Sequence, residues 1–194
     1  MKKVLSALAT LLLILCCGCS TGYREIERGY FVTAVGIQER ENKIQIILET
    51  LSASDREPGS ESVKILYGEG ESLSDAYGNI KKSLVKSLYF EQCGVIAADN
   101  GFTENEISEI LDFCNDLETL NIDVYVVRTD NAEALFETET AYKSVGYSII
   151  ELMKNSGSYD NAENQLYNIR KRYAGGSAEK LPSVNVKNDT LILE

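Results

Sequence analysis

The sequence has 194 residues, of which 44% are hydrophobic and only 2 are Pro, so it can bury a core of about one domain. Its formal net charge of -11 argues against nonspecific nucleic-acid binding and against general attraction to anionic lipid. The sequence contains no His, which excludes a Ser-His-Asp catalytic arrangement and disfavours a zinc site. We therefore expect no nucleic-acid partner, no metal, no cofactor and no enzymatic activity.

Residues 1–18 have the features of a lipoprotein signal peptide. Two lysines precede an apolar run of 14 residues, Val4–Cys17. That run is short for a transmembrane helix, which needs roughly 20 apolar residues. Gly18 followed by Cys19 has the shape of a bacterial lipobox, so we expect cleavage before Cys19 and acylation of its thiol as a membrane anchor. An ordinary cleaved signal peptide and an uncleaved short anchor are the alternatives.

The next segments predict antiparallel strands. Tyr30–Ile37 and Lys43–Leu51 are rich in β-branched residues and are separated by a charged turn of five residues, as in a β-hairpin. A polar loop then leads to a third strand in Glu61–Tyr67. On one face this strand carries Val63, Ile65 and Tyr67.

The stretch 68–98 predicts a turn, an amphipathic helix and a buried strand. Ser72 has the position of a helix N-cap, with Asp75 at capping-box spacing. One face of the expected helix carries Leu73, Ala76, Tyr77, Ile80, Leu84 and Leu88. Cys93–Ala98 is an unbroken apolar run, as expected of a strand covered on both faces.

A glycine pair, Gly68 and Gly70, comes directly before this helix and could in principle cradle a phosphate. The segment has neither a third Gly nor a following Lys, and it carries Glu69 and Glu71 where a phosphate would sit. A flexible turn between the strand and the helix is therefore the prediction.

The second half predicts alternating helices and strands. The expected elements are a helix at 103–115 capped by Thr103 and Glu106, a strand at 122–127, a short helix at 130–136 capped by Asp130, helices at 140–156 and 160–174, and strands at 184–186 and 190–193. The fold class is thus mixed α/β, with a mixed sheet of about four or five strands, packed helices and a helical C-terminal extension. We expect a signal peptide at 1–18, an α/β domain at 19–137, its helical extension at 138–176 and the start of a truncated region at 177–194.

Several residues are candidates for a site. Cys93 and Cys114 are expected to be buried thiols, although a disulfide is possible in an exported protein. Four acidic residues lie near the end of an expected helix, and their spacing fits no EF-hand loop: Asp112, Asp116, Glu118 and Asp123. They are interpreted as a solvated helix end. Four tyrosines are candidates for a partner-docking surface, with core packing as the alternative: Tyr142, Tyr147, Tyr167 and Tyr173. The run 170–172 is a basic spot that could meet lipid head groups or an acidic partner, with a solvated helix face as the alternative.

The order of several segments resembles a known family. After Cys19 come REIE, FVTAVGI, GEGESLSDAYGNIKKSLVKSLYFEQCGVIAA and EILDFCNDLETLNIDVYVVRTDNAEALF. In this order they are similar to the N-terminal part of the Ger(x)C family, the lipoprotein C subunits of spore nutrient germinant receptors. The resemblance implies a non-enzymatic protein held at the outer face of the spore inner membrane through acylated Cys19. It would assemble with two integral-membrane partners, the A and B subunits, in nutrient-triggered germination.

Members of this family continue into further domains after the segment that corresponds to 190–193. Two alternatives therefore accompany the receptor-subunit hypothesis. One is a membrane-anchored lipoprotein that binds a small-molecule germinant itself. The other is a truncated relative without function.

Overall fold

The computed structural model describes residues 29–53, 61–140, 142–156, 162–176 and 180–194. The expected signal peptide and Cys19 lie outside this part of the chain. A six-stranded sheet forms the centre, with the order β3-β2-β1-β5-β6 and with β4 paired to β1. Its strands are β1 (Tyr30–Arg40), β2 (Lys43–Ala53), β3 (Glu61–Gly70), β4 (Leu88–Tyr89), β5 (Val95–Asp99) and β6 (Tyr125–Thr129). The prediction of a mixed sheet with packed helices is confirmed.

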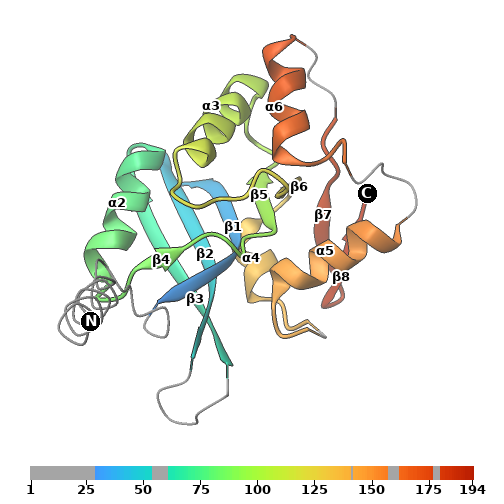
Figure 1. Cartoon of the computed structure of the whole chain (residues 1–194). Coiled ribbons are helices and arrows are strands. Elements are labelled where there is room, and N and C mark those ends of the chain that lie inside the picture. The colour runs from blue at the N-terminus through green and yellow to red at the C-terminus, as the bar shows by residue number, and fades with distance from the viewer. Residues whose placement is uncertain (1–28, 54–60, 141, 157–161, 177–179) are drawn as a thin grey trace, which may run out of the picture.

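Helices and a small hairpin cover the sheet on both faces, so the fold has three layers (Figure 1). One face carries α2 (Leu73–Ser83), α3 (Glu104–Asn115) and α6 (Leu166–Ala174). The other carries α4 (Ala132–Glu137), α5 (Val145–Asn155) and the two-stranded sheet of β7 (Val184–Lys187) and β8 (Thr190–Leu193). No helix in the described part of the chain is long and apolar enough to cross a membrane.

The central strand β1 combines both pairing modes. It is antiparallel to β2, and on its other edge it is parallel to β4 and β5. The hairpin with β2 is tighter than expected, because pairing continues to Arg40 and Lys43. Only Glu41 and Asn42 connect the strands, both with positive φ (52° and 61°), as in a two-residue type I′ turn. The predicted connection of five residues was therefore wrong.

The helix α2 begins as expected but ends earlier. The backbone N–H of Asp75 donates to the Ser72 hydroxyl at 3.2 Å, which confirms the N-cap. The helix stops at Ser83, because Leu84 adopts an extended conformation, and Leu88 belongs to β4. Both leucines still pack against the core, as their apolar character predicted. The prediction that they lie on the last turn of the helix was wrong.

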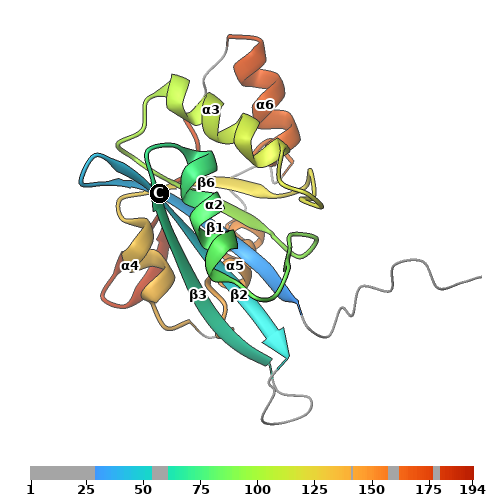
Figure 2. The ribbon, with the colours of Figure 1, turned by 90° about the vertical axis from the view of Figure 1, so that its left-hand side faces the viewer.

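Gly68 and Gly70 lie inside β3 rather than in a turn, so that prediction was also wrong. The reason is close packing of α2 against β3 and β2 (Figure 2). A Cβ on Gly68 would lie 2.4 Å from the carbonyl oxygen of Ala76 and 2.3 Å from a side-chain carbon of Ile80. Only glycine permits this approach of helix and strand.

Later elements differ from the prediction mainly at their starts. The short helix α4 is capped by Asn131, whose side chain accepts from the Ala134 N–H at 2.8 Å, and not by Asp130. The last helix begins at Leu166 instead of Asp160, and residues 157–161 lie outside the described part. The capping box of Thr103 and Glu106 on α3 is confirmed.

Candidate functional site

The four candidate docking tyrosines lie on elements that cover opposite faces of the sheet. Tyr142 precedes α5 and Tyr147 lies on it, with 58% and 36% exposure. Tyr167 and Tyr173 lie on α6, where Tyr167 is 59% exposed and Tyr173 packs against the core. The structure therefore does not bring the four together on one surface.

An exposed isoleucine lies beside Tyr167. The Tyr167 N–H donates to the Ile122 carbonyl at 3.3 Å, and Ile122 is 58% exposed. The sequence placed Ile122 at the start of a strand, but β6 begins only at Tyr125. Because the predicted strand began at Ile122, the exposure of this residue was not expected. Its side chain adds apolar surface next to Tyr167.

A buried carboxylate on β2 connects the sheet to α5. Glu49 is 1% exposed, and one of its oxygens accepts from the Thr33 hydroxyl (2.5 Å), the Ser144 hydroxyl (2.7 Å) and the Gly146 N–H (3.1 Å). Its other oxygen accepts from the Val145 N–H at 2.6 Å. The carboxylate thus caps the N-terminus of α5, where the helix dipole favours negative charge. Since protein donors enclose both oxygens, the arrangement fits a structural role.

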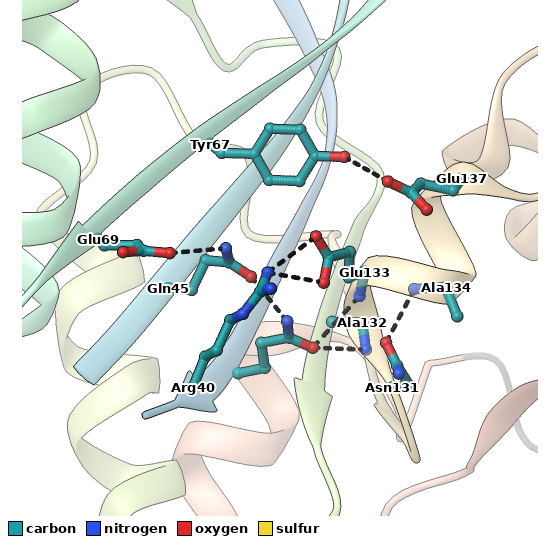
Figure 3. A network of polar contacts seen from close by, with 10 residues as sticks. Arg40, Gln45, Tyr67, Glu69, Asn131, Ala132, Glu133, Ala134 and Glu137 are labelled. Atoms are coloured by element: carbon teal, nitrogen blue, oxygen red, sulfur yellow. Dashed lines mark hydrogen bonds and ion pairs between the residues drawn. The ribbon is translucent and has the colours of Figure 1, made fainter. Parts of the chain in front are cut away.

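A second polar side chain of the hairpin holds α4 in the same way. The Gln38 amide oxygen accepts from the N–H groups of Ala132 (3.0 Å) and Glu133 (3.2 Å). Its nitrogen donates to Gln45 at 2.7 Å, and Gln45 donates to Glu69 at 3.2 Å. Figure 3 shows this network at the start of α4. The β1–β2 hairpin therefore supplies an acceptor to the N-terminus of each helix on this face.

Two exposed contacts surround this network (Figure 3). Arg40 pairs with Glu133 at 3.0 Å, which links the end of β1 to α4. The Tyr67 hydroxyl donates to Glu137 at 3.2 Å, and burial together with this carboxylate raises the pKa of Tyr67. Both contacts join the sheet to α4.

Both cysteines of the described part are buried and free. Burial raises the pKa of Cys93 to about 12 and that of Cys114 further. A thiol with so high a pKa is almost entirely protonated at neutral pH and is a poor nucleophile. The expectation of two buried thiols is thus confirmed.

The acidic candidates do not form a metal site in the described residues. Asp112 pairs with Arg170 at 3.3 Å, and Arg170 also donates to Asn115 at 2.5 Å. These contacts join α6 to α3, which lie side by side in Figure 1. Within the described ranges, no three His, Cys, Asp or Glu side chains are grouped as metal ligands.

Comparison with known protein families decides the identity of the domain. Residues 22–185 match the family described as the spore germination protein N-terminal domain. The chain belongs to this family. No curated protein and no solved structure gives a significant match.

The family match confirms the resemblance to the Ger(x)C proteins and associates the chain with spore germination and germinant receptors. The spore germination domain includes the whole six-stranded sheet and the helices on both of its faces. It also includes the polar contacts of Glu49 and Gln38. Cys19 lies outside the matched residues.

Proposed function

We propose that this chain is a lipid-anchored, non-enzymatic subunit of a spore germinant receptor. The observation that carries the proposal is the family match over residues 22–185. The Glu49 and Gln38 side chains accept hydrogen bonds from backbone N–H groups at the starts of α5 and α4, which supports a structural role for these two polar groups. The domain would therefore act by assembly with the integral-membrane A and B subunits.

Acylation of Cys19 would hold the domain at the outer face of the spore inner membrane. Two or more acyl chains anchor a protein stably, at about 0.8 kcal/mol per buried CH₂. About ten residues separate Cys19 from β1, and a segment of that length spans at most ~35 Å. The domain would thus remain close enough to the bilayer to contact partners embedded in it.

Exposed aromatic residues would provide the contacts with these partners. Tyr167 beside Ile122 offers one apolar surface, and Tyr142 and Tyr147 are exposed before and on α5. Tyrosine is favoured in protein interfaces because it combines a large apolar ring with a polar hydroxyl. Tyr173 packs against the core and would contribute less.

Co-purification tests the anchored-subunit proposal. The wild-type chain, Cys19→Ala and the matched control Cys17→Ala would be produced in a sporulating host that carries the A and B subunits. Spore inner membranes would then be blotted for all three proteins. We expect wild type and Cys17→Ala in the membrane with both partners, and loss of Cys19→Ala. A membrane-bound Cys19→Ala would contradict the anchor, and a membrane-bound wild type without A or B would contradict receptor assembly.

A further inference from the structure

The connections of β5 and β6 leave the sheet on opposite faces. These two strands are parallel neighbours. The chain after β5 enters α3, which packs in one core, and the chain after β6 enters α4, which packs in the core of the other face. In open sheets with parallel strands, ligands bind at the carboxyl ends of neighbouring strands whose connections diverge in this way.

A cavity of about 630 Å³ lies at this position. Its volume falls within the range of about 300–1,000 Å³ typical of small-molecule sites. The β5–α3 connection, the end of β6, the end of α6 and the segment before β7 all contribute to its wall. Phe102, Ile107 and Leu181 supply apolar surface.

Arg128, at the end of β6, gives the cavity a positively charged group. Its backbone N–H donates to the Pro182 carbonyl at 2.7 Å, which fixes its position. One terminal nitrogen, Nη2, donates to the carbonyls of Phe102 (2.6 Å) and Asn100 (3.2 Å). The other, Nη1, is buried and has no hydrogen-bond partner among the described residues. A buried donor without an acceptor is costly, so this nitrogen favours an added anion.

The charged groups of the cavity wall are two cations, Arg128 and Lys180, and three carboxylates, so the unpaired Arg128 nitrogen, and not the net charge, favours an anion. Lys180 lies in this wall, is exposed, and forms no ion pair with another described residue. Three acidic residues line the cavity as well, but two already bind protein donors. Asp130 accepts from Asn100 at 2.6 Å, and Glu194 accepts from Lys187. Of the three, only Glu104 has no such hydrogen bond in the described part.

We propose that this cavity binds a small aliphatic carboxylate between Arg128 and Lys180. The carboxylate accepts hydrogen bonds from the Arg128 guanidinium, and the aliphatic part contacts Phe102 and Leu181. Because Nη1 is buried, a carboxylate can reach it only if a neighbouring side chain moves aside. The site does not depend on the anchor or on the receptor partners, so it can be tested on the purified chain.

The test uses the full chain in detergent with sodium butyrate as the probe. Sodium chloride at equal ionic strength and 1-butanol serve as comparisons, because each supplies only the charge or only the apolar part. Nuclear magnetic resonance of the Arg128 Nε–H group reports on binding, and the thermal unfolding midpoint reports on stabilisation by mass action. We expect butyrate to shift both signals in a saturable way, whereas chloride and butanol leave them unchanged.

Two exposed-residue variants make the test specific. Lys180→Gln should weaken butyrate binding by about threefold, the size expected of a partly exposed ion pair. Arg40→Gln, which removes an arginine outside the cavity, should bind butyrate as the wild type does. An absence of saturable butyrate binding, an equal response to chloride, or an equal loss of affinity in both variants would overturn the proposal. None of these outcomes bears on membrane anchoring or receptor assembly.

Discussion

The Glu49 carboxylate accepts a hydrogen bond at 2.6 Å from the Val145 backbone N–H, although 96 positions separate the two residues in the chain. This contact fixes the start of α5 on the second strand of the sheet. Together with the bonds from Thr33, Ser144 and Gly146, it satisfies a charge that is almost completely buried. Replacement of the Glu49 carboxylate should therefore lower the stability of the fold.

Glu49→Gln should lower the free energy of unfolding by roughly 2 kcal/mol. The substitution keeps the size of the side chain. However, an amide NH₂ group replaces one carboxylate oxygen and cannot accept the hydrogen bond that this oxygen accepted. The remaining hydrogen bonds are then made to a neutral group instead of a charged one. For a protein of this size, the unfolding midpoint should fall by about 4–8 °C. Thermal unfolding followed by circular dichroism measures the change. Glu39→Gln, an exposed position on the neighbouring strand, is the control and should change stability by less than about 0.5 kcal/mol.

Gly68→Ala and Gly78→Ala should have opposite effects. At Gly68 the new methyl group would overlap the backbone of α2, so we expect a loss of about 1–3 kcal/mol in unfolding free energy. Gly78 lies within α2, and a Cβ there meets no atom within 4 Å. Alanine at this position should stabilise the helix by about 0.5–1 kcal/mol. Urea unfolding of both variants would measure this difference, and equal effects would contradict the close packing of α2 on β3.

The buried thiol of Cys93 should make stability depend on alkaline pH. Its pKa is raised from the ordinary value of 9.0 to about 12 by burial, so the unfolded chain releases this proton at lower pH than the folded chain does. The unfolded state then binds fewer protons above about pH 9, and the free energy of unfolding falls as pH rises toward 12.

Cys93→Ala should reduce this dependence. By linkage, one thiol accounts for a loss of about 1 kcal/mol between about pH 8 and pH 10, and this part should be missing in the variant. Urea unfolding at both pH values measures it, with any constant cost of the substitution cancelling in the comparison. An unchanged pH dependence would show that the thiol ionises equally easily in the folded protein.

Replacement of both Ile122 and Tyr167 by Ser should weaken assembly with the A and B subunits. Loss of a central interface tyrosine often costs about 2 kcal/mol of binding free energy, or roughly a 30-fold loss of affinity. Both side chains are largely exposed, so stability should change little. Co-purification measures the effect, with Val85→Ser as the control because Val85 is a fully exposed apolar residue elsewhere. Full recovery of both partners with the double variant would exclude this surface from docking.

Local signals in the sequence predicted much of the fold. The caps at Ser72 and Thr103 were found because each depends on residues three positions apart. The five longer strands were found from their apolar and β-branched composition. The start of α4 was missed by one position, since Asp130 and Asn131 are both good caps and only the fold decides that Asp130 bonds to Asn100.

Features that depend on contacts between distant parts of the chain could not be predicted from the sequence in the same way. Glu49 lies in an alternating strand segment, and nothing nearby in the sequence indicates that its partners are 95 to 97 positions away. Gly68 had the appearance of a turn residue because the close approach of α2 is a tertiary contact. The tyrosines were grouped by sequence distance, whereas α5 and α6 pack on opposite faces of the sheet.

The position of β1 has a mechanical consequence. Partners lie along both of its edges, with β2 on one side and β4 and β5 on the other. A pull applied at Tyr30 acts along the strand axis and loads many of these bonds at once, in shear. By contrast, β8 pairs only with β7 in the described part, and a pull at Glu194 would peel that hairpin open one pair at a time. The domain should therefore withstand tension through its amino-terminal end far better than through its carboxyl-terminal end.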